Sequence, residues 1–316
     1  MVDILQGVNR VRDLFEKINI EGKIAFGEPL SNYTTFQVGG PAEVFAQPRS
    51  IADVKRLVEC AEEHRIPWFI LGGGANILVS DAGISGLVIH MESLSEIRRQ
   101  GTTLFAQAGI PVSKAAAWAA DQGLSGFDFI YAMPGSVGGA IWMNARCYGS
   151  EIADILTRVT YLDPQGTIRT MVPSREEFRY KDTPFMKNSN VILQGEFNLH
   201  REDSRVLWNR MRGYEADRRS KGHFDAPCAG SIFKNNRDFG APSGKLIDSL
   251  GLRGLAYRGA QVSPGHANII INRGGALASD IRALITQVQQ RVQDGLGITL
   301  EPEVLFVGDW EHEQSS

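Results

Sequence analysis

Cysteine is scarce in this chain, and its spacing excludes several classes of protein. The three cysteines, Cys60, Cys147 and Cys228, include no pair at CxxC spacing. An odd number without close pairs argues against a disulfide framework and favours a reducing compartment. The six histidines show no HxxxH or His/Cys ligand spacing either. We therefore expect no metal site.

Long apolar runs and a strong net charge are also absent. The sequence has no run of about 18 apolar residues, the length that spans a membrane. Its N-terminus, MVDILQGVNRVRDLFEK, is amphipathic and lacks the apolar core of a signal peptide. A net charge of −3 creates no field that attracts nucleic acid or anionic lipid. We expect a soluble cytoplasmic protein without nucleic-acid or membrane partners, and its 316 residues indicate two or three domains.

Apolar periodicity predicts alternating helices and strands. We expect helices at 50–64 with Ser50 as N-cap, at 112–122, at 204–217, and from a cap at Ser279 or Asp280. Strands are expected at 68–71, 88–90, 104–106 and 191–199, with a hairpin at 155–172. Residues 126–149 show no strong period and are interpreted as an irregular wall around a ligand. The basic stretch 217–222 is predicted to be a loop at a domain boundary, and the polar tail from Glu311 is expected to fray.

Two glycine-rich segments are the first candidate binding site. One runs directly from the strand at 68–71, and bare backbone N–H groups there can approach a diphosphate. Neither segment has the Rossmann or P-loop pattern, and each alone also fits a plain turn. Together they favour a dinucleotide held between two small α+β lobes. The expected contact residues are Gly72, Gly73, Gly74, Ala75, Asn76, Ile77, Pro134, Gly135, Ser136, Gly138, Gly139 and Asn144. The two asparagines could equally brace loops.

A serine turn and a glutamate form the second candidate site. Gly230 permits a tight turn that presents the Ser231 hydroxyl three residues before the ammonium of Lys234. Glu303 precedes an apolar strand, where a carboxylate is costly unless it is paired or functional. The basic residues Arg218, Arg219 and Lys221 suit a diphosphate clamp, although they also fit a solvated face.

These segments together resemble the UDP-N-acetylenolpyruvoylglucosamine reductase family, also called UDP-N-acetylmuramate dehydrogenases. The resemblance covers nearly the whole chain, and its specificity comes from several motifs in one order. They are NYTTFQVGGPA (32–42), LGGGANILVSD (71–81), GLSGFDFIYAMPGSVGGAIWMNA (123–145), AGSIFKN (229–235), GAQVSPGHANIIIN (259–272) and LEPEVLFVG (300–308).

The resemblance implies an α+β fold: a vanillyl-alcohol-oxidase-type FAD-binding fold of two lobes plus a third α+β substrate domain. The implied lobes are residues 1–80, with 304–316 packing back on them, and 81–208, while residues 209–303 would bind a UDP-sugar. NADPH would reduce FAD, and hydride would then pass to the enolpyruvyl ether of the substrate. Ser231 would protonate the adjacent carbon as general acid, and Glu303 would orient the substrate carboxylate. The implied substrate contacts are Tyr180, Arg218, Lys221, Lys234, Asn235 and Gln261.

This chain departs from the family pattern in two places. Lys181 stands where an arginine is usual, which keeps the charge but loses the bidentate fork. We expect Lys181 to be the third catalytic group. Arg179 is the alternative, although on a strand it would face the opposite side. Arg146 stands where a small residue is usual. The short stretch between Lys181 and Val191 lacks a tyrosine-bearing loop, which places the chain with the loop-less type II form.

Two other functions remain open on the sequence. The first is another flavin oxidoreductase of the same fold, and the second is a non-catalytic protein that binds FAD or a UDP-sugar. The sequence retains both Ser231 and Glu303, which argues against the non-catalytic alternative. The expected partners are small molecules, and we expect a monomer.

Overall fold

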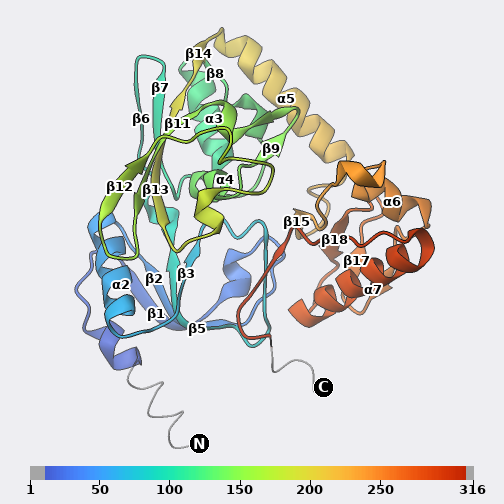
Figure 1. Ribbon diagram of the computed structural model, residues 1–316, viewed down its shortest axis with the longest axis horizontal. Helices are drawn as coiled ribbons and strands as arrows, with labels where there is room; N and C mark the ends of the chain where they lie inside the picture. The colour runs from blue at the N-terminus through green and yellow to red at the C-terminus, as the bar shows by residue number, and fades with distance from the viewer. Residues whose placement is uncertain (1–10, 311–316) are drawn as a thin grey trace, which may run out of the picture. The chain divides into compact units, whose positions relative to one another are not determined.

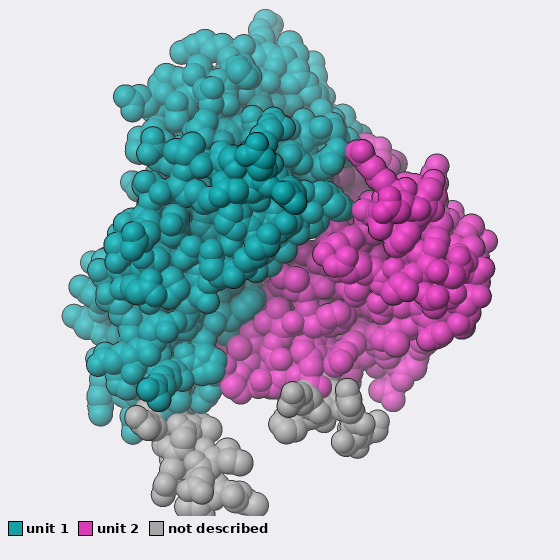
Figure 2. Space-filling model, viewed as in Figure 1, with its two compact units in different colours: residues 1–27, 43–73, 86–216 teal, residues 28–42, 74–85, 217–316 magenta. Residues whose placement is uncertain are grey.

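The computed structural model describes residues 11–310. The expectations for the first ten residues and for the tail from Glu311 lie outside this range. The chain divides into two compact units (Figure 2). Unit 1 comprises residues 1–27, 43–73 and 86–216, and unit 2 comprises residues 28–42, 74–85 and 217–316. The chain crosses between the units several times, and one crossing falls inside the triple glycine, between Gly73 and Gly74.

The first sheet carries the strand that leads into the triple glycine. Its order is β1-β2-β5-β3, with β3 parallel to β5. The strands are β1 (Lys23–Pro29), β2 (Pro41–Gln47), β3 (Trp68–Leu71) and β5 (Ile84–His90). Helix α2 (Ile51–Glu63) buries Val54, Leu57 and Val58 in the same core as residues of β2 and β5. The predicted cap is confirmed, because the Ser50 hydroxyl accepts a hydrogen bond from the Asp53 N–H at 3.1 Å.

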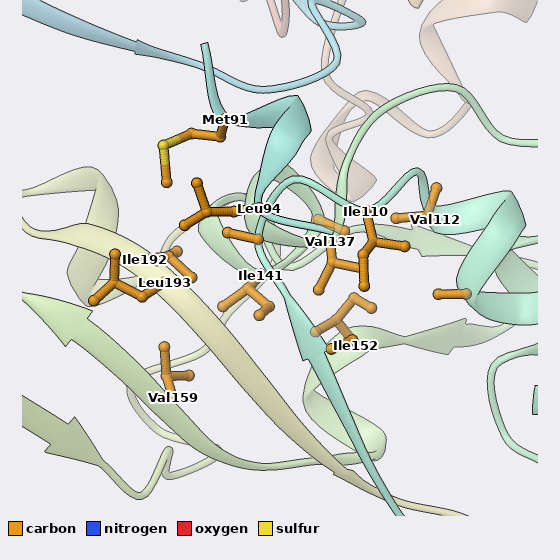
Figure 3. Close-up of a cluster of buried hydrophobic side chains, with 14 of the residues drawn as sticks. Met91, Leu94, Ile110, Val112, Val137, Ile141, Ile152, Val159, Ile192 and Leu193 are labelled. Atoms are coloured by element: carbon orange, nitrogen blue, oxygen red, sulfur yellow. The ribbon is translucent and has the colours of Figure 1, made fainter. Parts of the chain in front are cut away.

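The second sheet of unit 1 is antiparallel throughout, in the order β12-β11-β13-β7-β6. Its strands are β6 (Ile97–Gln100), β7 (Thr103–Gln107), β11 (Leu156–Leu162), β12 (Ile168–Met171) and β13 (Val191–Asn198). The predicted hairpin is confirmed, with Leu162 paired to Ile168. Helix α3 (Val112–Asp121) buries its alanine stripe in the same core. Ile110, Val137, Ile141, Ile192 and Leu193 belong to this cluster of buried side chains (Figure 3).

The segment 126–149 is more regular than predicted. It contains the six-residue helix α4 (Val137–Trp142), which packs on β13. Two glycines in so short a helix leave too few apolar positions for a visible period. The segment also holds β9 (Arg146–Cys147), which pairs with β10 (Ser150–Glu151) across a turn. Tyr148 and Gly149 have φ of 50° and 85° in that turn, as a two-residue hairpin requires. Unit 1 also contains the short strands β8 (Leu124–Ser125) and β14 (His200–Arg201), which pair with each other.

Unit 2 is built on an antiparallel sheet in the order β15-β18-β17-β16. Helix α7 (Ala278–Leu296) packs against it (Figure 1). The strands of the sheet are β15 (Cys228–Ser231), β16 (Ala256–Tyr257), β17 (Ala260–Val262) and β18 (Ile269–Asn272). Unit 2 also contains helix α6 (Ser243–Ser249) and the parallel pair β4 (Ile77–Val79) and β19 (Leu305–Val307). Among residues 11–310, none of the helices combines the length and apolar character needed to cross a bilayer.

Two predicted boundaries in this part of the chain were wrong. Helix α5 (Ser204–Ser220) continues through most of the stretch predicted as a basic loop. Helix α7 begins at Ala278, one residue before the predicted caps. The Asp280 carboxylate accepts from the Leu277 N–H at 3.0 Å. The carboxylate of Asp81, which comes from a distant part of the sequence, accepts from Ala278 and Ser279 at 2.7 and 2.9 Å. A cap supplied by a distant residue leaves no local sequence signal.

Candidate functional site

The two glycine segments predicted to bind a cofactor lie against each other in unit 1. A Cβ atom on Gly73 would lie 2.6 Å from the Cα of Gly135, and one on Gly72 would lie 2.5 Å from the Ser136 hydroxyl oxygen. Neither Gly72 nor Gly73 has a positive φ. Glycine is therefore required at these positions by close approach and not by backbone conformation. The turn after β3 and the turn before α4 form one side-chain-free surface, which we call the glycine cradle.

Part of this region serves packing inside the protein. The Gly138 N–H donates to the Ala108 carbonyl at 2.8 Å, and the Gly139 N–H donates to the Ser136 hydroxyl at 3.3 Å. A Cβ on Gly138 would meet the Ala108 side chain at 2.8 Å. Among the glycines of the two segments, Gly72, Gly73 and Gly135 therefore lie where the two turns meet, whereas Gly138 lets α4 approach its neighbour.

Two features beside the cradle carried no sequence signal. Ala132 has a φ of 58°, in the left-handed region that alanine seldom adopts. The following carbonyl, that of Met133, is held by the Ser113 hydroxyl at 2.9 Å. His90 is buried, and its ring lies 3.2 Å from the Gln47 amide nitrogen. Burial lowers the pKa of His90, although Glu92 and a hydrogen bond with the Gly72 backbone oppose that effect. A neutral imidazole therefore supports the turn at Gly72.

Asn144 braces the loop that carries the predicted basic group. Its side chain is fully buried, and its amide donates to the Arg179 carbonyl at 3.3 Å while its oxygen accepts from the Ala153 N–H at 3.0 Å. The neighbouring departure from the family pattern, Arg146, is exposed on β9.

The segment around Lys181 is a turn and not a strand. The Arg179 and Asp182 backbones bond to each other, with N···O distances of 2.8 and 3.3 Å. Tyr180 and Lys181 occupy the tip, and Lys181 has a φ of 53°. The argument that Arg179 faces away from Lys181 on a strand was wrong, because the segment is a turn and because residues two apart on a strand share one face. Arg179 is instead anchored by its Nε, which donates to the Glu176 carbonyl at 2.9 Å. A left-handed lysine without glycine or asparagine gives no turn signature.

Ser231 and Glu303 come from distant parts of the sequence but share one region of unit 2. The Glu303 N–H donates to the Ile232 carbonyl at 2.7 Å, and the Lys234 N–H donates to the Glu301 carbonyl at 2.9 Å. These bonds place the Glu303 backbone beside the residue that follows Ser231. Both Ser231 and Glu303 are half-buried. The Asn76 amide donates to the Glu303 carbonyl at 3.0 Å, so the end of the first glycine segment reaches the same region.

Asn268 holds the serine turn and was missed by the sequence reasoning. Its side-chain oxygen accepts from the Phe233 N–H at 3.0 Å, and its amide donates to the Phe233 carbonyl at 2.9 Å. A buried amide that uses both its groups on one residue fixes the backbone just after Ser231. The one sequence signal that could have identified Asn268 was its position in the motif at 259–272.

Several predicted substrate contacts also bond within unit 2. The Lys234 ammonium pairs with the Glu301 carboxylate and not with the Ser231 turn. The Asn235 side chain accepts from the Ser243 N–H at 2.9 Å, and the Gln261 amide donates to the Gly254 carbonyl at 3.0 Å. Arg218 is 8% exposed in the last turn of α5, so a solvated face does not describe it. Lys221 pairs with Asp217 at 2.7 Å.

Two models of known protein families match separate parts of this chain. Residues 42–171 match the model of an FAD binding domain. Residues 222–307 match the model of the UDP-N-acetylenolpyruvoylglucosamine reductase C-terminal domain. The first range contains the glycine cradle, and the second contains Ser231 and Glu303. Since a side-chain-free surface suits a diphosphate, the cradle fits the cofactor that the first match implies.

Relatives match over nearly the whole chain. The UDP-N-acetylenolpyruvoylglucosamine reductase of Treponema denticola is 41% identical over 92% of this chain and 95% of its own length. That of Borrelia garinii is 38% identical over 95% and 98%.

A solved structure supports the same assignment. The crystal structure of the reductase from Thermus caldophilus superposes with a TM-score of 0.76 at 30% identity, covering 91% of this chain and 99% of that one. This agreement confirms the predicted α+β flavin-binding fold with an additional domain. The chain belongs to the UDP-N-acetylenolpyruvoylglucosamine reductase family.

Proposed function

We propose that this protein is an NADPH-dependent flavoenzyme that reduces UDP-N-acetylglucosamine enolpyruvate to UDP-N-acetylmuramate, a precursor of peptidoglycan. The observation that carries the proposal is the pairing of the Ser231 and Glu303 segments in unit 2, in a chain whose unit 1 has a glycine cradle. Family membership supports it. A cytoplasmic location follows from the substrate class, and we propose a monomer.

The cradle residues Gly72, Gly73 and Gly135 are the proposed holders of the FAD diphosphate. When bound, FAD supplies a two-electron carrier that accepts hydride from NADPH and yields it to the enolpyruvyl double bond. In functional terms, residues 1–80 and 81–208 provide the proposed flavin lobes, and residues 209–303 provide the sugar-nucleotide domain.

Ser231 is the proposed general acid. Addition of hydride to the terminal carbon of the enolpyruvyl group leaves a carbanion-like centre next to the carboxylate, and that centre must take up a proton. A positioned acid contributes about 10²–10⁴-fold to such a step. Gly230, with a φ of 69°, and Asn268 hold the backbone on either side of Ser231. Glu303 is proposed to orient the substrate carboxylate through a shared proton, and Lys181 is the proposed cation.

The ion pair between Lys234 and Glu301 limits which cation can assist Ser231 as a general acid. A neutral hydroxyl is a weak acid, and a nearby cation assists it. Because Lys234 already has a carboxylate partner, we assign this assistance to another cation and not to Lys234. Lys234 is then a residue that ties the serine segment to the glutamate segment.

The proposal is tested with the purified protein. We expect a yellow protein whose flavin is released into the supernatant by acid, because no residue that links flavin covalently is evident. NADPH should be oxidised in a reaction that requires the enolpyruvyl substrate. A colourless protein that FAD cannot reconstitute would contradict the proposal. Turnover with oxygen alone would favour another flavin oxidoreductase, and bound FAD without any turnover would favour a binding protein.

A further inference from the structure

Basic side chains gather at the start of the sugar-nucleotide part of unit 2. Arg218 lies in the last turn of helix α5, and the chain then turns back so that the His223 N–H donates to the Arg218 carbonyl at 3.2 Å. The His223 ring faces His266, with ring centroids 5.8 Å apart and planes inclined by 48°. Lys221 and Arg253 complete the group, which we call the histidine cluster.

The part of the cluster around His266 is held by the bonds of Arg253 and by packing of helix α6. Arg253 donates to the Pro264 and Gly265 carbonyls, both at 3.2 Å, and pairs with Asp248. A Cβ on Gly244 of helix α6 would lie 3.4 Å from His266, so that helix packs directly against the ring. Helix α6 and the Arg253 guanidinium therefore fix the turn that carries His266.

The charged groups around the two imidazoles can be named. Arg218 and Lys221 face His223, while Asp217 is the nearby carboxylate and is paired with Lys221. Asp225 lies at the Gly222 turn. Arg253 and Lys221 face His266, and Asp248 neutralises Arg253. The imidazoles thus lie among basic side chains, some of which already have carboxylate partners.

Both imidazoles are neutral near pH 7. Burial lowers the pKa of His223 to about 4, with further lowering by Arg218, His266 and Lys221. Burial also lowers the pKa of His266, followed by Arg253 and Lys221. The His266 Nδ1 lies 3.2 Å from the Asn268 N–H and accepts its hydrogen bond. The proton of neutral His266 therefore resides on Nε2.

We propose that the His223–His266 pair takes up a proton when the diphosphate of a sugar nucleotide binds beside Arg218 and Lys221. The inference rests on the proposed function, since it assigns the diphosphate to this cluster. Burial and the nearby basic groups keep the imidazoles neutral, and two negative charges placed here oppose both effects by stabilising the protonated form. The pair then acts as a pH-sensitive element of substrate binding.

The sign of the pH dependence follows from this arrangement. An opposite charge within about 4–6 Å raises the pKa of a base by about one to three pH units. The bound form therefore holds the proton at a pH where the free form has lost it. The added affinity is complete below the pKa of the free form and disappears as pH rises through the pKa of the bound form. Lowering the pH from about 7 to about 5 should tighten binding about tenfold.

The test is titration calorimetry of the FAD-loaded protein with UDP-N-acetylglucosamine. Both phosphates of this probe are diesters whose charge stays constant over the range. Titration near pH 5.5 in two buffers of different ionisation enthalpy counts the protons taken up. We expect about half a proton or more, and the tenfold change in Kd between pH 7 and pH 5. His223→Gln should lose most of both effects, whereas His200→Gln, an exposed histidine on β14, should keep them.

Each outcome decides the inference. Binding of the probe with no proton uptake overturns the inference and leaves the proposed function standing. Absence of any binding overturns both. Proton uptake that persists in His223→Gln, in His266→Gln and in the double variant also overturns the inference. The wild-type proton count does not depend on any variant folding, and retained flavin checks the fold of each variant.

Discussion

Glycine has different roles in the glycine cradle of unit 1 and in the serine turn of unit 2. In unit 1, a Cβ on Gly73 would lie 2.6 Å from the Gly135 Cα, although Gly73 has no positive φ. In unit 2, Gly230 has a φ of 69°, and a Cβ there would meet nothing within 4 Å. The cradle needs the absence of a side chain at Gly73, whereas the serine turn needs the backbone conformation of Gly230. The proposed cofactor region is thus defined by steric exclusion, and the proposed catalytic region by the backbone conformation that precedes Ser231.

The same contrast extends to the chemistry. The cradle of unit 1 presents backbone, and its neighbouring imidazole, His90, is buried and neutral. The proposed substrate region of unit 2 presents titratable side chains, among them Glu303, Lys221 and His223. Substitutions in unit 1 should therefore act mainly on flavin retention and stability, and those in unit 2 mainly on rate and pH dependence. Lys181, which belongs to unit 1, tests the limit of this division.

The largest effect is expected at Ser231 in unit 2. Ser231→Ala should leave bleaching of the flavin by NADPH close to normal, because no carbon is protonated in that step. Reoxidation by the enolpyruvyl substrate should slow by about 10²–10⁴-fold. Stopped-flow absorbance resolves both steps on one sample.

Two control variants belong with this measurement. Ser231→Cys should be milder, since a thiol can also donate a proton, and the exposed Ser249→Ala in α6 should behave as wild type. Equal slowing of both steps would indicate a folding or cofactor defect. No slowing of the second step would remove Ser231 from the mechanism.

Lys181 belongs to unit 1, yet we expect its substitution to change the rate of turnover, as substitutions in unit 2 should. Lys181→Ala should reduce turnover about a hundredfold, since loss of a charge that stabilises an oxyanion costs about 3 kcal/mol. Lys181→Arg should retain or raise turnover. Steady-state kinetics with NADPH measures both, and Lys187→Ala, a lysine paired with Asp182 nearby, serves as control. Full activity of Lys181→Ala would move the basic role to Arg179 or another residue.

A matched set of glycine variants tests the two roles directly. Gly73→Ala should cost about 1–3 kcal/mol of stability through overpacking and should lose most of the flavin. Gly230→Ala should cost about 1–2 kcal/mol through its left-handed backbone but retain the flavin. Gly213→Ala, at an open position in helix α5, should stabilise by about 0.5–1 kcal/mol. Flavin absorbance and thermal unfolding measure all three. Normal flavin content in Gly73→Ala would contradict the cradle.

The smallest effect is expected in an ion-pair network of unit 1. Arg210 donates to Asp128 at 2.9 Å and also pairs with Glu202. Although burial would raise the pKa of Asp128, hydrogen bonds from Arg210 and the backbone hold it below its ordinary value. The stabilisation is therefore present above the unfolded-state pKa and disappears as pH falls through the folded-state pKa.

Asp128→Asn should accordingly cost about 1 kcal/mol at neutral pH and less in acid, with unchanged flavin content. Urea unfolding at several pH values measures the difference. Asp203→Asn, which removes an exposed pair with Arg205, should cause no measurable change. An equal loss for Asp128→Asn at neutral and acid pH would show that packing, and not charge, explains it.

Local features of the fold could be predicted because their causes are local. The Ser50 cap and the apolar stripe of α2, the strand that runs into Gly72, and the hairpin ending at Leu162 and Ile168 each depend on neighbouring residues. The predictions failed where a distant group replaced a local one. Asp81 helps to cap α7, and the turn at Lys181 has no glycine or asparagine of its own.

From the sequence by itself, the order of the motifs indicated a flavin-binding fold and predicted Ser231 and Glu303 as catalytic residues. The tertiary structure decided how those residues meet. It placed Asn76 against Glu303 across 227 residues of sequence, buried Arg218 at the end of α5, and paired Lys234 with Glu301. It also brought Gly73 against Gly135 and His223 against His266. Residue types and short spacings are local properties, whereas burial, close approach and charge environment arise only when distant segments pack together.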